Sequence, residues 1–183
     1  MQLRIIMCIA CLAAVMTVCH AGQERPKTLI MYFSLTGNTI PVAEKLRELT
    51  GGDLYRIETA HSYPLERPAR TEVPKQELES GVWPELKNPL PDFTQYDLIL
   101  LGGPVWWYTV STPLRSVLQQ ADFAGKKVAP FVTHDGGMGD YWQYFEQNVN
   151  NGVVLKGIDF YRAHNETTQA LEQKLGNWLE TLN

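Results

Sequence analysis

The sequence predicts an α/β fold built on a doubly wound parallel sheet. From residue 27 onward, short apolar runs alternate with segments whose apolar residues recur at helical spacing. This alternation is typical of β-α-β units, in which a helix connects two parallel strands. The runs at residues 28–33 and 96–103 are nearly continuous, which predicts buried strands, the second of them at the centre of the sheet.

Length and composition restrict the class of protein. The 183 residues suffice for one well-packed domain, and the hydrophobic (44%) and charged (20%) fractions are those of a globular protein. The formal net charge of -4 argues against a nucleic-acid partner, because binding to phosphates along a backbone requires a basic face. We expect residues 22–183 to form a single domain without repeats.

Residue spacing places the elements of the first half of the chain. The strand over residues 28–33 is followed by a helix that ends at the Gly51-Gly52 pair. Residues 53–59 alternate in polarity and predict a second, more exposed strand. Residues 60–95 contain six of the eleven prolines, so we expect a long loop with one helix over residues 70–79, and a loop of this length often covers a functional site.

The second half continues the alternation. The strand over residues 96–103 is the strongest of the chain, and we expect its glycines and Pro104 to end it. The remaining expected elements are helices over residues 112–120, 140–148 and 166–182, the last capped by Asn165, and strands over residues 127–133 and 153–162, the last broken at Gly157.

Residues 1–21 have the layout of a secretory signal peptide. Arg4 supplies a positive charge, and residues 5–18 form an apolar run that is shorter than a typical transmembrane helix. Small residues precede a cleavage point after Ala21. We therefore expect export to the periplasm, with no membrane span left after cleavage. A lipid anchor on Cys19 is the alternative. All three cysteines lie in this leader, so the mature domain offers no thiol and no disulfide.

Three loops that follow predicted strands carry the candidate site, because ligands of doubly wound sheets bind beyond the carboxyl ends of the strands. The first loop is Ser34-Leu35-Thr36-Gly37-Asn38-Thr39. Its hydroxyls and its backbone N–H groups at a helix N-terminus favour a phosphate held by neutral donors. The loop lacks both the lysine of nucleotide triphosphatases and the G-x-G-x-x-G pattern of dinucleotide sites. A hydroxyl-rich helix cap without a ligand is the alternative.

The second loop places three large aromatic residues side by side after the central strand. It reads Pro104-Val105-Trp106-Trp107-Tyr108. Aromatic side chains at the rim of a site can stack on a flat ring and exclude water from it. The alternative is a local aromatic cluster that packs under the long segment over residues 60–95.

The third loop follows the next strand and is rich in glycine. It begins at Thr133, His134, Asp135, Gly136 and Gly137. The glycines let the backbone approach a ligand closely, the imidazole can titrate near neutral pH, and the carboxylate adds a negative charge. A flexible turn with solvated side chains is the alternative. No residue cluster in the mature chain predicts a metal site.

Together the three loops resemble the flavin-binding loops of the flavodoxins. FSLTGNT after the first strand is similar to their S/T-x-T-G-N-T loop, which holds the phosphate of FMN. YDLILLGGPVWW with the following TPLRSVL resembles the second flavin loop and its helix, and FAGKKVAPFVTHDGGMGD resembles a third loop of the Thr-His-Gly-Gly type. The resemblance extends from Lys27 to Leu182 in the same order.

The resemblance implies a five-stranded sheet of order 2-1-3-4-5, an FMN cofactor and a role for each loop. Asp135 stands where the family has a glycine, and it could either strengthen hydrogen bonding to the ring or repel a reduced, anionic flavin. The implied phosphate residues are Ser34, Thr36, Gly37, Asn38 and Thr39. The implied ring residues are Pro104, Val105, Trp106, Trp107, Tyr108, Thr133, His134, Asp135, Gly136 and Gly137.

The implied function is electron transfer through bound FMN, either to a partner protein or to a small acceptor such as a quinone. An enzyme of the quinone-reductase type would enclose its substrate above the flavin, with Tyr63 and Trp83 in the covering segment, whereas a carrier would leave the flavin edge exposed. The sequence leaves both open. The competing interpretation is a binding module that has kept the fold but transfers no electrons.

Overall fold

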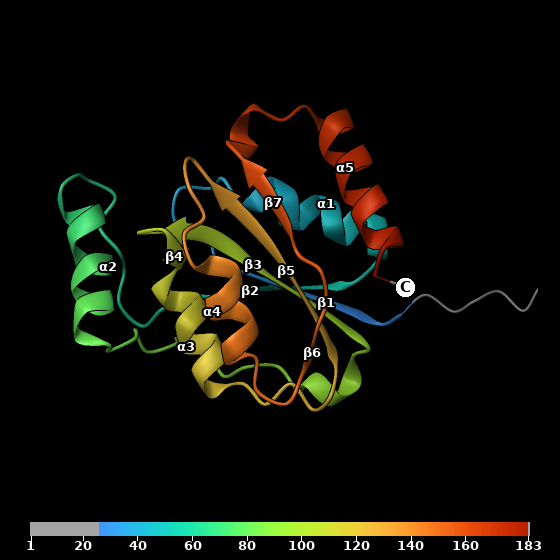
Figure 1. Ribbon diagram of the computed structural model, residues 1–183, viewed down its shortest axis with the longest axis horizontal. Helices are drawn as coiled ribbons and strands as arrows, with labels where there is room; N and C mark the ends of the chain where they lie inside the picture. The colour runs from blue at the N-terminus through green and yellow to red at the C-terminus, as the bar shows by residue number, and fades with distance from the viewer. Residues whose placement is uncertain (1–25, 183) are drawn as a thin grey trace, which may run out of the picture.

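The computed structural model describes residues 26–182, so the predicted leader and its cysteines lie outside the described residues. The described chain forms a twisted central sheet with helices on both faces (Figure 1). None of its helices combines the length and the apolar character that a membrane span requires.

The sheet has the predicted parallel order. Its main strands are β1 (Thr28–Tyr32), β2 (Asp53–Arg56), β3 (Leu98–Trp106), β5 (Lys127–His134), β6 (Val153–Val154) and β7 (Ile158–Tyr161). They run in the order β2-β1-β3-β5-β6, and each neighbouring pair is parallel. The predicted fifth strand is present as two pieces, β6 and β7, which both pair with β5 and flank the break at Gly157. The predicted order 2-1-3-4-5 is therefore confirmed.

Two helices cover each face of this sheet (Figure 1). They are α1 (Ile40–Thr50) and α5 (Thr168–Glu180) on one face and α3 (Thr112–Gln120) and α4 (Tyr141–Asn148) on the other. Each face has its own core, because alternate residues of a strand point to opposite sides. Leu100 of β3 packs in the core under α1 and α5, whereas its neighbour Leu101 packs in the core under α3 and α4.

The helix ends confirm one sequence prediction and correct another. The helix α1 ends at Gly51, whose φ of 69° is in the left-handed region, as the glycine pair predicts. The prediction that Asn165 caps the last helix is wrong. Asn165 belongs to a short 3-10 turn (Ala163–Asn165), and Thr167 is the cap, with its hydroxyl oxygen accepting a hydrogen bond from the N–H of Ala170.

The central strand is longer than the sequence predicts. Gly102, Gly103 and Pro104 do not end β3, which continues to Trp106 and turns back into the short antiparallel strand β4 (Thr109–Val110). The pairing of β3 with β1 stops at Gly102, whose carbonyl accepts from Phe33 N–H. The backbone groups of residues 102 and 104 face the same side of β3, the side of β1. Because β1 has already ended at the level of Pro104, the N–H group that proline lacks would have no partner there, and the sheet loses no hydrogen bond.

The irregular segment over residues 60–95 contains the helix predicted for residues 70–79, one residue longer at each end. The helix α2 (Ala69–Ser80) stands apart from the four helices that cover the sheet, at the end of the molecule where β3 and β4 turn (Figure 1). Pro74 is its only buried residue. A short 3-10 turn (Phe93–Gln95) then leads into β3. Besides Val73, which packs against the core under α3 and α4, polar contacts link α2 to the rest of the protein.

A buried tyrosine in α4 provides a test of the core. The side chain of Tyr141 is fully buried, its hydroxyl has no hydrogen-bond partner among residues 26–182, and burial raises its pKa above the ordinary value of a tyrosine. We expect Tyr141→Phe to stabilise the fold by about 1 kcal/mol, because it removes an unsatisfied polar atom. Urea denaturation measures the change. Destabilisation by a similar amount would show that the hydroxyl is satisfied.

The same tyrosine predicts a pH dependence. A folded-state pKa above the unfolded value means that its contribution to stability is fully present below about pH 10 and is lost as the pH rises further. Tyr141→Phe should therefore reduce the alkaline loss of stability. Urea denaturation at pH 8 and pH 11 compares the two proteins, and an identical alkaline loss in both would contradict the expectation.

Candidate functional site

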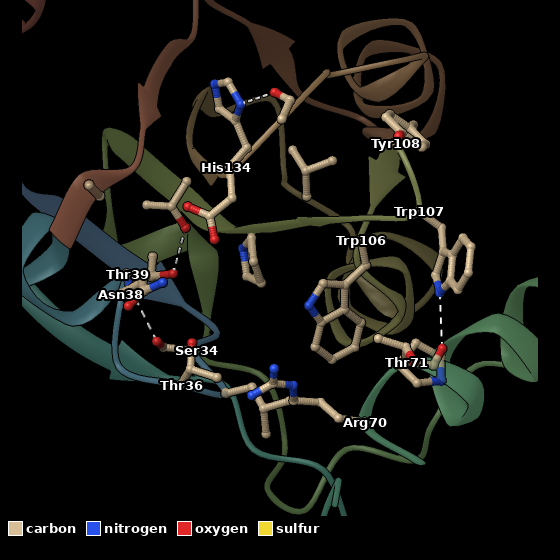
Figure 2. Close-up of a pocket in the computed structure, with 18 of the residues that line it drawn as sticks. Ser34, Thr36, Asn38, Thr39, Arg70, Thr71, Trp106, Trp107, Tyr108 and His134 are labelled. Carbon is tan, nitrogen blue, oxygen red and sulfur yellow. Dashed lines mark hydrogen bonds between the residues drawn. The ribbon is translucent and has the colours of Figure 1, made fainter. Parts of the chain in front are cut away.

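A cavity of about 640 Å³ opens beyond the carboxyl ends of β1, β3 and β5 (Figure 2). This position is the switch point of the sheet, where the strand order reverses between β1 and β3. Of the fifteen residues predicted for the site, only Gly37 does not line the cavity. The lining residues are Ser34, Leu35, Thr36, Asn38, Thr39, Arg67, Arg70, Thr71, Pro74, Pro104, Val105, Trp106, Trp107, Tyr108, Thr133, His134, Asp135, Gly136, Gly137 and Ala163.

The first loop offers free backbone donors to this cavity. The N–H groups of residues 35–38 donate to no other residue of the described chain. Two of the three hydroxyls have structural partners: the Ser34 oxygen accepts from Thr39 N–H at 3.3 Å, and the Thr39 hydroxyl lies 2.9 Å from that of Thr133. Thr36 is exposed and has no such partner. Thr39 stands at the N-cap of α1 but makes no side-chain capping bond, which argues against a simple helix cap.

The second loop is a tight hairpin that presents its aromatic residues to the cavity. Trp106 lies edge-on to Phe33 (5.4 Å between ring centroids) and to Tyr63 (5.0 Å), so it both lines the cavity and packs under the segment over residues 60–95. Trp107 and Tyr108 form the two-residue turn with φ values of 51° and 62°. Glycine or asparagine is the usual residue in such turns, and each left-handed side chain costs about 1–2 kcal/mol.

The third loop lines the cavity with its backbone more than with its imidazole. The ring of His134 is turned toward Gly136, whose carbonyl oxygen contacts Nδ1 (Figure 2). Its Nε2 lies 3.1 Å from Oδ2 of Asp159 in β7. The carboxylate of Asp135 is exposed and lies 4.0 Å from the ring of His164. The third loop is therefore fixed to the sheet through His134, while Asp135 faces solvent at the rim.

A fourth wall, from the start of α2, was not predicted from the sequence. Arg67, Arg70, Thr71 and Pro74 line the cavity. The sequence prediction that the 60–95 segment covers a site agrees with this placement, but the residues it named do not line the cavity: Tyr63 is buried in the core, and Trp83 stacks on Arg115 outside the cavity. No motif marks these four residues, and only their position in the one helical part of a long segment could have drawn attention to them.

Polar contacts fix α2 beside the cavity. The Glu77 carboxylate accepts hydrogen bonds from Tyr63 (2.8 Å) and from Thr112 at the start of α3 (2.6 Å). Burial raises the pKa of Tyr63 well above its ordinary value, which keeps its hydroxyl protonated and able to donate. At the other end of the helix, the indole N–H of Trp107 donates to the carbonyl of Thr71 at 3.0 Å (Figure 2). The helix is thus tied both to the body of the protein and to the aromatic loop.

The fold and the cavity define a doubly wound α/β protein with a ligand site at the switch point of its sheet. A protein-family model described as Flavodoxin matches residues 27–182. The chain therefore belongs to the flavodoxin family. A search of curated proteins found no match.

Solved structures support the same fold. A flavoprotein from Lactobacillus acidophilus, solved in complex with FMN, is 24% identical to this chain, and the match covers 84% of this chain and 99% of that one with a TM-score of 0.69. A protein from Bacteroides uniformis, assigned as a flavoprotein, is 27% identical over 82% of this chain and 97% of its own, also with a TM-score of 0.69. Both likenesses extend over nearly the whole described chain.

Proposed function

We propose that this protein binds FMN in the cavity and transfers electrons through it. Membership of the flavodoxin family and the FMN complex of the Lactobacillus acidophilus flavoprotein support this cofactor. The observation that carries the proposal is the combination, in one cavity, of backbone N–H groups that donate to no residue among 26–182 on one wall and three aromatic side chains on another.

The residues present fit the two ends of FMN. A phosphoester is rich in hydrogen-bond acceptors, and the N–H groups of residues 35–38 with the free hydroxyl of Thr36 are donors without partners in the described chain. A flat apolar ring fits beside aromatic side chains. Trp106, Trp107, Tyr108 and the backbone of residues 134–137 would border the ring, and Thr36 and Asn38 would hold the phosphate.

When bound, FMN supplies the redox chemistry, and the protein residues set its environment. Trp106 and the neighbouring aromatic rings exclude water from one side of the ring site, and the tether of His134 to Asp159 and Gly136 keeps the third loop in place. We infer that the electron acceptor is a small molecule such as a quinone, because the start of α2 adds a further wall to the cavity, whereas a carrier protein would leave the flavin open to a partner.

Export remains part of the proposal. Residues 1–21 would direct the chain to the periplasm and be removed after Ala21, with the lipid anchor on Cys19 as the alternative. Mass spectrometry of the protein recovered from the periplasm distinguishes the two: the unmodified mature chain begins at Gly22, whereas an anchored chain begins at a lipidated Cys19. A cytoplasmic chain that keeps its first residues would contradict both.

Binding of FMN by the purified mature protein tests the function. We expect the protein to quench flavin fluorescence and to remain yellow after desalting, whereas a binding module without redox work would take up no flavin. Thr36→Val should weaken FMN binding by about 1 kcal/mol, roughly fivefold, because it removes a donor to the phosphate. Riboflavin, which lacks the phosphate, is the matched control ligand and should bind both proteins equally. An equal loss for both ligands would place the phosphate elsewhere.

A further inference from the structure

Two arginines that form no ion pair with residues 26–182 face the proposed cofactor site. Arg67, just before α2, and Arg70, in its first turn, line the cavity and form no ion pair within the described chain. Arg67 is exposed, whereas Arg70 is half-buried. Arginine is rarely withdrawn from water without an anion beside it, because its charge loses hydration. An anionic ligand in the cavity would supply the missing partner.

The cavity itself holds little negative charge to meet these cations. Asp135 is the only carboxylate among its lining residues. The side chain of Asp135 is 66% exposed and lies beside His164, at the rim formed by the third loop. The lining is therefore net positive, although the chain as a whole carries a net charge of -4. This local excess of positive charge indicates an anionic ligand.

The position of Arg70 indicates which part of the ligand it meets. Arg70 lies at the same edge of the cavity as Thr36, below the ring of Trp106 (Figure 2). The first loop, with its free N–H groups, forms this edge from the other side. The contacts of α2 with Tyr63, Thr112 and Trp107 hold Arg70 there. The first loop, whose donors are neutral, and Arg70 of α2, which is positively charged, thus face one another across the same part of the cavity.

We propose that Arg70, with Arg67 as a more exposed second cation, binds the phosphate of FMN from the side opposite the first loop. This inference rests on the proposed function and adds a charge to a pocket that the first loop alone would leave neutral. A phosphate monoester carries nearly two negative charges and three acceptor oxygens, so a cation on the side away from the first loop can still pair with it. A guanidinium matches two of those oxygens at once. The helix α2 then serves as a clamp on the cofactor.

Binding of FMN and of riboflavin to the full mature chain tests the clamp. Arg70→Gln should weaken FMN binding by about tenfold to a hundredfold and leave riboflavin binding within about twofold, because a charge-assisted hydrogen bond is lost only to the phosphate. The affinity for FMN should also fall less steeply with added salt in the variant than in the wild type. Arg70→Lys, which keeps the charge, should recover part of the loss. Arg67→Gln should show a smaller effect of the same kind.

Arg47→Gln is the matched control, because it makes the same change at an exposed position of α1 outside the cavity. Equal losses for FMN and riboflavin, or no loss for either, would overturn the clamp. Unchanged FMN binding with a raised KM for an anionic acceptor would also overturn it, since Arg70 would then serve the reactant. Failure of the wild type to bind FMN at all is a different result, because it removes the proposed function itself.

Discussion

Glu77→Ala is expected to release α2 from the body of the protein. The Glu77 carboxylate joins two hydroxyls that lie far apart in the sequence, those of Tyr63 and Thr112, and its side chain is only 13% exposed. Its removal deletes two charge-assisted hydrogen bonds and should lower the free energy of opening α2 by about 2–4 kcal/mol. Hydrogen exchange of the α2 amides measures this change, because local opening exposes them without global unfolding.

Glu79→Ala provides the control for this change. It removes a carboxylate from the same helix, but that side chain is 66% exposed and only pairs with Lys75 at 3.8 Å. Such surface pairs contribute less than about 1 kcal/mol, so exchange in α2 should change little. Equal exchange rates in the Glu77 and Glu79 variants would mean that other contacts hold the helix. If α2 also clamps the cofactor, Glu77→Ala should weaken FMN binding more than riboflavin binding.

The dependence of α2 on Glu77 explains why sequence reasoning missed this wall of the cavity. The sequence predicts a helix over residues 70–79, but α2 buries only Pro74, so no apolar stripe shows which of its faces packs against the protein. Its position comes from polar contacts to Thr112, 35 residues further along the chain, and to Trp107. Neither contact follows from local spacing. The presence of Arg67 and Arg70 at the cavity therefore could not be predicted from the sequence.

The parts that could be predicted depend on local sequence and on general topology. Continuous apolar runs indicated the central strands, and the rule that ligands bind beyond their carboxyl ends brought the three loops together. The end of β3 was predicted wrongly because glycine and proline usually stop a strand, yet Pro104 lies where its strand no longer has a neighbour on one side. His134 lines the cavity, but its contacts with the Gly136 carbonyl and with Asp159, which lies 25 residues further along the chain, could not be predicted from local sequence.

Gly139 of the third loop allows a close contact with the backbone of the aromatic hairpin, and Gly139→Ala tests this contact. A Cβ at Gly139 would lie 2.0 Å from the Tyr108 carbonyl oxygen, and its φ of 52° is in the left-handed region. That carbonyl accepts the N–H of Asp140 at 3.1 Å, so the loop and the aromatic hairpin are in direct backbone contact. Neither backbone can move without displacing the other. We expect the substitution to lower the free energy of unfolding by about 2–5 kcal/mol.

Gly136→Ala is the control in the same loop, because a Cβ there meets nothing within 4 Å and the residue has no positive φ. It should change stability by less than about 0.5 kcal/mol. Urea denaturation measures both variants, and equal stability of the two would contradict the close backbone contact. The contact also predicts the effect on binding: displacement of the Tyr108 turn shifts the aromatic wall of the cavity. Gly139→Ala should therefore weaken riboflavin and FMN alike, whereas loss of the clamp at Arg70 acts on FMN alone.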